Sequence, residues 1–330
     1  MLYELQNKYI KIKVNTLGAE LKSLYSLHNN KEYLWSGNPD YWKRSAPILF
    51  PFVGRLNKQQ YRYNGKTYKM SQHGFARDKE FQLIEKKDNK LSFLLTEDKQ
   101  SYAIYPFKFN LTQEYELQEN KLIVSWKVTN TDKKLLYFSI GAHPAFICPF
   151  SDNEKTCRLK FNTDKSLSYR LVNKDSLLAD EFHPLILQDS IWQFTKDVFN
   201  KDAYILENYQ INSIALLNKD NDPYLTIHFQ SPVVGIWSPA HKNAPFICLE
   251  PWYGRCDAEN FAGELKDRDF SNALPGGSTF STQYEIEINL YFSNTIIIQK
   301  LYLLFIRWNI MQQQIRIIIN NPAQCPFITD

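Results

Sequence analysis

The chain has 330 residues, with 39 basic and 35 acidic side chains mixed along its length and a formal net charge of +4. No run of lysine or arginine resembles a nucleic-acid-binding patch, so no nucleic-acid partner is expected. The length suffices for one large β domain or two ordinary ones. Aromatic residues make up 15% of the chain, and this content favours strands over helices.

The cysteines and histidines indicate a reduced protein without a metal site. Five cysteines form no CxxC pair, and the opening MLYELQNKYIKI lacks the apolar segment of a secretory signal. We therefore expect free thiols in a cytoplasmic protein. The six histidines show neither HxH nor HExxH spacing, so no metal ligand is predicted.

Short alternating runs broken by turn residues follow from the start of the chain. Strands or hairpins are predicted in residues 9–15, 61–70, 81–98 and 107–140. Asn64-Gly65 is a strong two-residue hairpin signal, because both positions tolerate the positive φ of a type I′ turn. Residues 175–185 and 189–199 are expected to hold a helical turn or two. The pattern predicts one domain, residues 1–289, built as a large antiparallel β-sandwich.

The sequence changes character after Asn289. Residues 295–320 are rich in Ile, Gln and Asn and lack both alternation and turn signals. Lys300 and Arg307 interrupt the segment, and the apolar run between them is far short of the roughly 20 residues that a membrane span needs. An amphipathic surface helix is an alternative without a clear polar face. We predict that residues 290–330 are an atypical extension outside the domain, and that no membrane is bound.

Three polar clusters interrupt the apolar pattern. His73 and Arg77 lie in SQHGFARDKEF, His143 lies in FSIGAHPAFICPF, and Glu250 lies in APFICLEPWYGRCD. An unpaired buried carboxylate is costly or becomes neutral through a raised pKa. Taken singly, each histidine can be a structural residue, and Glu250 can pair with Arg77 or Arg55. Together, these residues at strand ends beside Gly or Pro favour a cleft.

The residue types in this cleft favour proton transfer. The chain has no GxSxG elbow, phosphate-binding loop or dinucleotide fingerprint. A glycosidase or lyase is disfavoured because only Glu250 is well placed, with Asp257 a weak second carboxylate. A Glu/His pair suits the opening of a cyclic hemiacetal, where a base takes the anomeric proton and an acid protonates the ring oxygen.

Four stretches, in this order and spacing, carry a family resemblance: YLWSGNPDYWKRSAPILFPFVGRL, QHGFAR, GAHPAF and CLEPWYGRCD. Together they resemble the aldose 1-epimerase (galactose mutarotase) superfamily, its LacX-type branch and the neighbouring glucose-6-phosphate 1-epimerase-like proteins. The resemblance covers residues 1–289. It implies the all-β, galactose mutarotase-like supersandwich with a sugar site in the concave face of one sheet.

The resemblance also implies roles for five residues. Glu250 becomes the general base on the anomeric hydroxyl and His143 the general acid at the ring oxygen. His73 becomes a second imidazole near that oxygen, and Arg55 a ligand of sugar hydroxyls. Arg77 resembles an arginine of the hexose 6-phosphate branch that can meet a phosphate. Its alternative role is to pair with a neighbouring carboxylate and support its loop.

The expected function is that of an aldose 1-epimerase. The alternatives are a hexose-6-phosphate 1-epimerase and a non-catalytic carbohydrate-binding protein on the same fold. We expect a sugar or sugar phosphate as ligand, no cofactor, and a monomer or weak homodimer. Trp42, Trp237 and Trp252 are expected either to stack on sugar faces or to pack in the core. Galactose mutarotases carry a sugar-binding aspartate on another strand, and no residue here is assigned to it.

Overall fold

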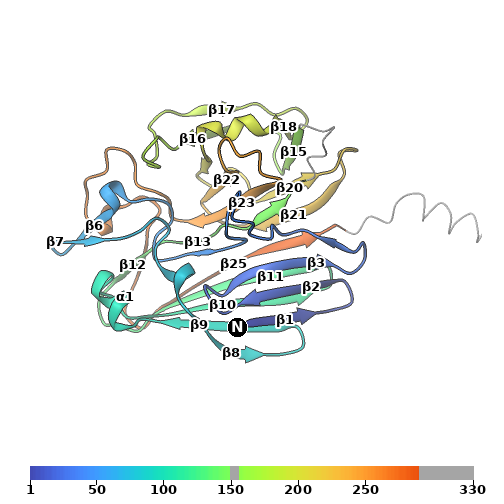
Figure 1. Cartoon of the computed structure of the whole chain (residues 1–330). Helices are drawn as coiled ribbons and strands as arrows, with labels where there is room; N and C mark the ends of the chain where they lie inside the picture. The colour runs from blue at the N-terminus through green and yellow to red at the C-terminus, as the bar shows by residue number, and fades with distance from the viewer. Residues whose placement is uncertain (149–155, 290–330) are drawn as a thin grey trace, which may run out of the picture. The chain divides into compact units, whose positions relative to one another are not determined.

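The computed structural model describes residues 1–148 and 156–289, and most of their regular structure is β-strand (Figure 1). The largest sheet has nine antiparallel strands in the order β18-β15-β20-β21-β25-β11-β10-β9-β8. Buried and half-exposed positions alternate along its central strands, because one face packs on the core. Its strands are β8 (Gln82–Lys86), β9 (Lys90–Thr96), β10 (Phe109–Gln118), β11 (Lys121–Asn130), β15 (Thr156–Phe161), β18 (Ile191–Thr195), β20 (Ser213–Leu217), β21 (Pro223–Phe229) and β25 (Thr279–Ile288).

A four-stranded sheet, β1-β2-β3-β4, packs on part of this large sheet. The rings of Tyr3 and Phe93 meet edge-on with centroids 6.0 Å apart. The Tyr115 hydroxyl donates a hydrogen bond to the Ala19 carbonyl at 2.6 Å. These contacts tie the beginning of the chain to the large sheet. The strands are β1 (Leu2–Gln6), β2 (Ile10–Asn15), β3 (Glu20–Ser26) and β4 (Lys31–Glu32).

An eight-stranded sheet carries the candidate site. In the view of Figure 1 its strands β13, β22 and β23 lie above strands β8 to β11 of the large sheet. Its order is β17-β16-β19-β22-β23-β13-β5, with β14 also paired to β23. All but the last residue of β23 are buried, as expected for a strand covered on both faces. The strands are β5 (Ile48–Leu49), β13 (Ile140–Ala142), β14 (Ala145–Ile147), β16 (Leu167–Leu171), β17 (His183–Leu185), β19 (Tyr204–Glu207), β22 (Val233–Trp237) and β23 (Phe246–Tyr253).

Two strand pairs and a few short helices complete the described residues. The predicted hairpin is confirmed: Tyr63 pairs with Lys66 across Asn64 and Gly65, whose φ values of 49° and 71° suit a type I′ turn. This hairpin joins β6 (Gln60–Tyr63) to β7 (Lys66–Lys69), and β12 (Leu136–Phe138) pairs with β24 (Asn272–Leu274). The helices are α1 (Lys99–Ile104) and the 3₁₀ segments η1 (Asn57–Gln59), η2 (Ala76–Asp78), η3 (Lys196–Lys201) and η4 (Leu265–Asp267).

The all-β sandwich is therefore confirmed, while the helix predictions are mostly wrong. Residues 175–185 contain β17 and no helix, and residues 189–199 contain β18 before η3 begins. The alternating burial of β18 explains this, since its buried side chains face the core beside β15. Helix α1 was not predicted. It begins after Asp98, whose carboxylate accepts a hydrogen bond from the Ser101 N–H in a capping box.

Residues Met1–Asn289 form one compact unit. The predicted extension, residues 290–330, lies outside the described residues and stays a prediction. Within the part of the chain that the structure describes, no helix is both long and apolar enough to cross a membrane.

Candidate active site

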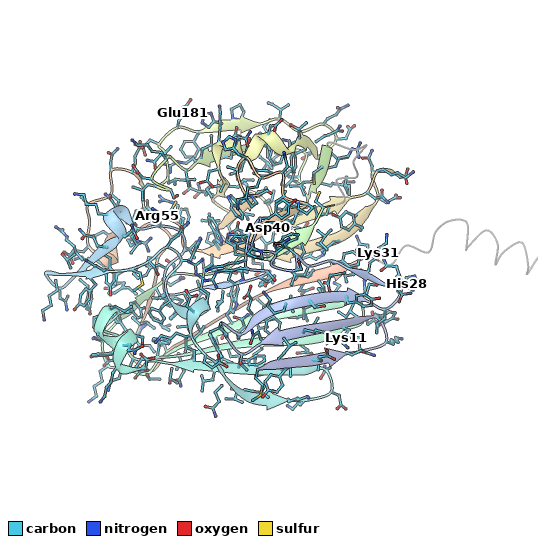
Figure 2. All side chains as sticks on the ribbon, viewed as in Figure 1. Lys11, His28, Lys31, Asp40, Arg55 and Glu181 are labelled. Atoms are coloured by element: carbon cyan, nitrogen blue, oxygen red, sulfur yellow. The ribbon has the colours of Figure 1, made fainter. Side chains whose placement is uncertain are left out.

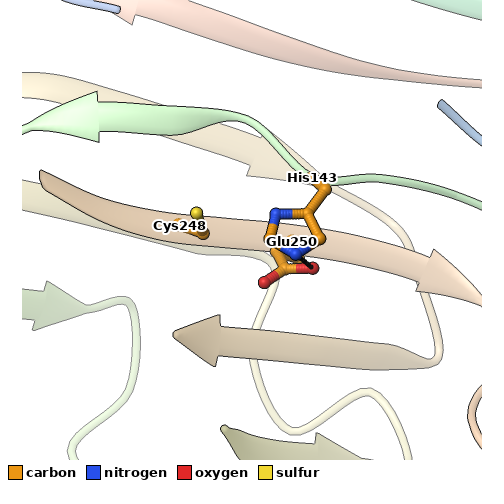
Figure 3. A group of neighbouring side chains, drawn as sticks. All are labelled: His143, Cys248 and Glu250. Atoms are coloured by element: carbon orange, nitrogen blue, oxygen red, sulfur yellow. Dashed lines mark ion pairs between the residues drawn. The ribbon is translucent and has the colours of Figure 1, made fainter. Parts of the chain in front are cut away.

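The central pair of the site comes from two neighbouring antiparallel segments. Ala145 on β14 lies opposite Cys248 on β23, so the same register places His143 opposite Glu250. The His143 Nε2 and Glu250 Oε2 atoms are 3.3 Å apart (Figure 3). Among the described residues, His143 is thus the titratable partner within reach of the Glu250 carboxyl, and no arginine lies within ion-pair distance of it.

Burial disfavours the charged form of both members of this pair. Glu250 is 1% exposed and His143 is 7% exposed. Burial raises the pKa of the Glu250 carboxyl well above its ordinary value, and the Trp252 side chain acts in the opposite direction. Burial also lowers the pKa of His143 to about 3. Burial therefore favours a protonated carboxyl on Glu250 and a neutral imidazole on His143.

Aromatic rings fix the orientation of the His143 imidazole. Trp42 stacks on it with ring centroids 4.7 Å apart and planes at 28°. Trp237 meets it edge-on at 5.4 Å and 82°. Both tryptophans are only partly buried and line the pocket, so they can also meet a ligand.

Trp252, the third tryptophan singled out in the sequence, is mainly a core residue with one edge on the pocket. It is 4% exposed and belongs to a buried apolar cluster. Two glycines leave room for its indole, because a Cβ on Gly141 or on Gly235 would lie 2.6 Å from ring atoms of Trp252. Of the two expected roles, sugar stacking and core packing, its burial favours core packing.

His73 is held as a neutral hydrogen-bond donor. The backbone N–H of Gly54 donates to His73 Nδ1 at 3.1 Å, which leaves the proton of the neutral ring on Nε2. Burial lowers the pKa of His73 well below its usual value, and the positive charge of Arg77 adds to this shift. The rings of His73 and His143 lie edge-on with centroids 5.6 Å apart. The QHGFAR segment thus brings its imidazole to the Glu250–His143 pair.

Positive side chains occupy one side of the pocket. Arg77 donates from Nη2 to the Gln72 carbonyl at 2.7 Å and lies 3.7 Å from the Asp78 carboxylate through Nε. Arg44 contacts the same carboxylate at 2.7 Å. Burial, reinforced by Arg44, lowers the pKa of Arg77 to about 10. Two guanidinium groups therefore share one carboxylate, and Lys43 lines the same pocket.

These residues surround one pocket with a volume of about 530 Å³. The structure brings four of the five predicted site residues together here: Glu250, His143, His73 and Arg77. Arg55, labelled in Figure 2, instead lines a neighbouring pocket of about 250 Å³. The lining residues of the larger pocket are Trp42, Lys43, Arg44, Gly54, Gln72, His73, Arg77, His143, Val172, Ser176, Asp202, Ala203, Ile205, Trp237, Glu250, Trp252 and Cys256.

Asp202 is a pocket residue that the sequence reading missed. Its backbone has φ 71° and ψ −154°, a strained conformation that non-glycine residues rarely adopt and that occurs most often at functional sites. Burial raises the pKa of its carboxyl, while hydrogen bonds from the Ala203 N–H and from Trp237 act in the opposite direction. No local pattern around NKDAY marks this aspartate. Arg44 was also missed, although it stands inside the first family stretch.

Asp257, the weak second carboxylate considered for a glycosidase, has a structural role. It pairs with Arg268 at 2.7 Å and accepts a hydrogen bond from the Asn57 N–H at 2.8 Å. These bonds join the segment after β23 to the loop before β6, and Asp257 does not line the larger pocket.

Comparison with known proteins identifies the family. Residues 1–266 match the model of the family described as aldose 1-epimerase. Chromosomal protein LacX of Lactococcus lactis subsp. lactis is 31% identical over 300 residues, which cover 87% of this chain and 99% of that protein. The galactose mutarotase related enzyme of Lactobacillus acidophilus has a TM-score of 0.82 and 32% identity, covering 88% of this chain and 98% of its own. A galactose mutarotase-like protein of Lactobacillus casei has a TM-score of 0.83 and 31% identity, covering 88% of this chain and 100% of its own. The chain belongs to the aldose 1-epimerase family and has the galactose mutarotase-like β-sandwich fold.

Proposed function

We propose that the protein is an aldose 1-epimerase, which interconverts the α and β anomers of an aldose by opening and reclosing the sugar ring. The observation that carries the proposal is the buried contact of 3.3 Å between His143 Nε2 and Glu250 Oε2, at a pocket of about 530 Å³. A pocket of this size suits a small ligand. An acid and a base side by side suit a reaction that adds a proton at one oxygen and removes one at another.

The reaction needs one proton within the pair. Transfer of that proton from Glu250 to His143 gives a carboxylate beside an imidazolium. Glu250 then takes the proton of the anomeric hydroxyl, His143 protonates the ring oxygen, and the bond between C1 and the ring oxygen breaks. The products are the open-chain aldehyde, a protonated Glu250 and a neutral His143, which is the protonation state that burial favours. Rotation about the C1–C2 bond and the reverse transfers close the ring as the other anomer.

The remaining pocket residues orient the sugar in this proposal. His73 keeps its Nε2 proton because Nδ1 is engaged by Gly54, so it donates a hydrogen bond toward the ring oxygen. Trp42 and Trp237 offer aromatic surface for the apolar face of a pyranose. The carboxyl of Asp202 accepts hydrogen bonds from sugar hydroxyls, a role that the family resemblance left without a residue.

The test is anomer exchange measured by NMR saturation transfer over a panel of free aldoses. We expect exchange well above the spontaneous rate for at least one sugar, and its loss in Glu250→Gln. Sugar binding without faster exchange in the wild type would instead support a non-catalytic carbohydrate-binding protein. An aryl glycoside included in the panel should remain intact, because Asp257 is committed to Arg268 and cannot act as a second catalytic carboxylate.

A hexose-6-phosphate 1-epimerase is the second candidate, and the positive side of the pocket favours it. Arg44 and Arg77 share the single carboxylate of Asp78, so positive charge remains to meet an anionic group. A planar guanidinium can hold a phosphate through two parallel hydrogen bonds. The same exchange assay, run with hexose 6-phosphates beside the free hexoses, distinguishes the two activities.

A further inference from the structure

Three different kinds of metal-binding side chain converge beside the proton-transfer pair. His143, Cys248 and Glu250 each offer one ligand atom, and these atoms all lie within 4.8 Å of one another (Figure 3). Cys248 and Glu250 stand two positions apart on β23, so both side chains point to the same face of the sheet. The strand pairing described above adds His143 opposite Glu250. The sequence spacing concealed this group, because more than 100 residues separate His143 from Cys248.

The group is buried and its polar atoms are incompletely paired. His143, Cys248 and Glu250 are 7%, 0% and 1% exposed. Within the described residues, His143 Nδ1 and Glu250 Oε2 have no hydrogen-bond partner. Buried polar atoms without partners are rare in folded proteins and often mark an absent water or ion. Glu250 Oε2 is thus free to bind a ligand and lies 3.3 Å from His143 Nε2, while Nδ1 is the nitrogen of that ring without a partner.

The separation of the His143 and Glu250 ligand atoms suits two ligands of a tetrahedral metal ion. Zinc binds nitrogen and oxygen ligands at about 2.0 Å, so two ligands of one tetrahedron are separated by about 3.3 Å. The observed separation of His143 Nε2 and Glu250 Oε2 is 3.3 Å. A combination of imidazole, thiol and carboxylate favours zinc-like ions over magnesium or calcium, which prefer oxygen ligands alone.

We propose that His143, Cys248 and Glu250 bind a thiophilic divalent cation of the Zn²⁺ type, and that the bound cation blocks the proton-transfer pair. The thiol proton, and the proton of Glu250, pass to solvent as the metal–sulfur and metal–oxygen bonds form. Water from the pocket fills the fourth position of the tetrahedron. The site is inhibitory, because a carboxylate bound to a metal can no longer take the anomeric proton.

The charges near the site limit which ions it holds. Arg44 and Arg77 line the same pocket and oppose any cation. A thiolate and a carboxylate together offset both charges of a divalent ion, and no negative charge is left to offset the two arginines. The ion is therefore retained only if it bonds strongly to the thiolate. Ions that bind thiolates weakly, such as Mg²⁺, are therefore not retained.

The binding test uses Co²⁺ as a spectroscopic substitute for Zn²⁺ on the chelator-treated whole protein. We expect a near-ultraviolet thiolate-to-cobalt charge-transfer band, together with visible bands of tetrahedral cobalt, and displacement of both by Zn²⁺. Cys248→Ala should lose the charge-transfer band. Cys157→Ala is the matched control, because Cys157 is also a buried thiol but lies on β15, outside the pocket lining and the three-residue group, and it should keep the band.

Three outcomes would overturn the metal site: no charge-transfer band in the wild type, a band that survives Cys248→Ala, or a band lost in Cys157→Ala. Far-UV circular dichroism checks that each variant is folded. Cys248→Ser, which keeps the size of the side chain, replaces Cys248→Ala if the latter unfolds, and it too should lose the band.

The inhibitory consequence rests on the proposed function and has its own readout. Zn²⁺ should stop anomer exchange in the wild type and in Cys157→Ala, and a chelator should restore it. Cys248→Ala should continue to exchange anomers at the same Zn²⁺ concentration. If the protein binds Co²⁺ but turns over no aldose, the metal site is supported and the epimerase proposal is contradicted. If the protein is active but gives no cobalt band, the epimerase proposal is supported and the metal site is contradicted.

Discussion

His143 and Glu250 face each other across two antiparallel segments with Nε2 and Oε2 3.3 Å apart, and burial raises the pKa of Glu250 while it lowers that of His143. A structural ion pair of this kind normally favours the charged forms of its members. Here the desolvation by the surrounding core acts against both charges. Such opposed shifts in a pocket are typical of groups that exchange protons with a ligand.

Glu250→Gln tests the base directly. The amide keeps the shape of the side chain but cannot accept the anomeric proton, so kcat should fall by about 10²- to 10⁴-fold. NMR exchange on the best substrate of the panel measures the loss. Glu181→Gln is the control, because it makes the same chemical change at a side chain that is 77% exposed on the surface, and it should keep the wild-type rate. Anomer exchange at the wild-type rate in folded Glu250→Gln protein contradicts the assignment.

The same substitution should stabilise the protein, increasingly so at higher pH. The folded-state pKa of Glu250 lies above its unfolded value of 4.5, so the folded protein binds the proton more tightly than the unfolded chain. Stability is then lost as pH rises above 4.5 toward the folded-state pKa. The glutamine side chain of the variant does not titrate in this pH range, so the variant does not lose this stability. His143, whose folded-state pKa is lowered, costs stability below pH 6.5 in both proteins, so its effect largely cancels in the comparison.

Urea unfolding of wild type and Glu250→Gln at several pH values measures this difference. The free energies of unfolding of the two proteins should differ least near pH 4.5, and the variant should gain relative stability as pH rises toward the folded-state pKa of Glu250. A constant difference across that range shows that Glu250 ionises normally in the folded protein.

The fold and the principal site residues were accessible from the sequence because they depend on local signals. Alternating runs reported the strands, and Asn64-Gly65 reported its hairpin. Glu250 and His143 were found because a polar residue in an apolar strand is chemically conspicuous. The register that sets one opposite the other is a non-local property, and no spacing in the sequence encodes it.

The residues that were missed lack such local signals. Asp202 stands in an ordinary polar loop, and only its strained backbone and its place in the pocket distinguish it. Arg44 reaches the site through its contact with Asp78, which lies 34 residues further along the chain. Helical turns were expected where β17 and β18 form. A strand forms instead of a helix at β18 because its pairing with β15 outweighs weak local preferences.

Arg77→Ala separates the two candidate substrates. If Arg77 meets a phosphate, its loss should raise KM for a hexose 6-phosphate by at least about 10-fold, as expected for one charged hydrogen bond, and change KM for the free hexose little. Steady-state NMR exchange on both sugars gives the two KM values. Arg62→Ala is the matched control, because Arg62 pairs with Glu264 away from the pocket. Equal losses on both sugars mean that Arg77 supports its loop through Gln72 and Asp78.

Gly54 links the fold to the chemistry, and its replacement by alanine should damage both. Its φ of +73° disfavours any other residue, and an alanine Cβ would lie 2.5 Å from the Cβ of Cys256. Gly65 provides a matched control, since its φ is +71° but a Cβ there has open space around it. Both substitutions share the conformational cost of about 1–2 kcal/mol. Gly54→Ala should add about 1–3 kcal/mol for the crowding.

The catalytic effect of Gly54→Ala follows from the hydrogen bond of 3.1 Å between the Gly54 N–H and His73 Nδ1. A backbone shift that relieves the crowding breaks this bond, and the His73 ring then loses the partner that keeps its proton on Nε2. Anomer exchange should therefore slow in Gly54→Ala under conditions where the protein is still folded, while Gly65→Ala keeps the wild-type rate. Urea unfolding and NMR exchange measure the two effects separately. Equal unfolding midpoints for the two variants contradict the crowding argument, and an unchanged exchange rate in Gly54→Ala shows that the tautomer of His73 does not depend on Gly54.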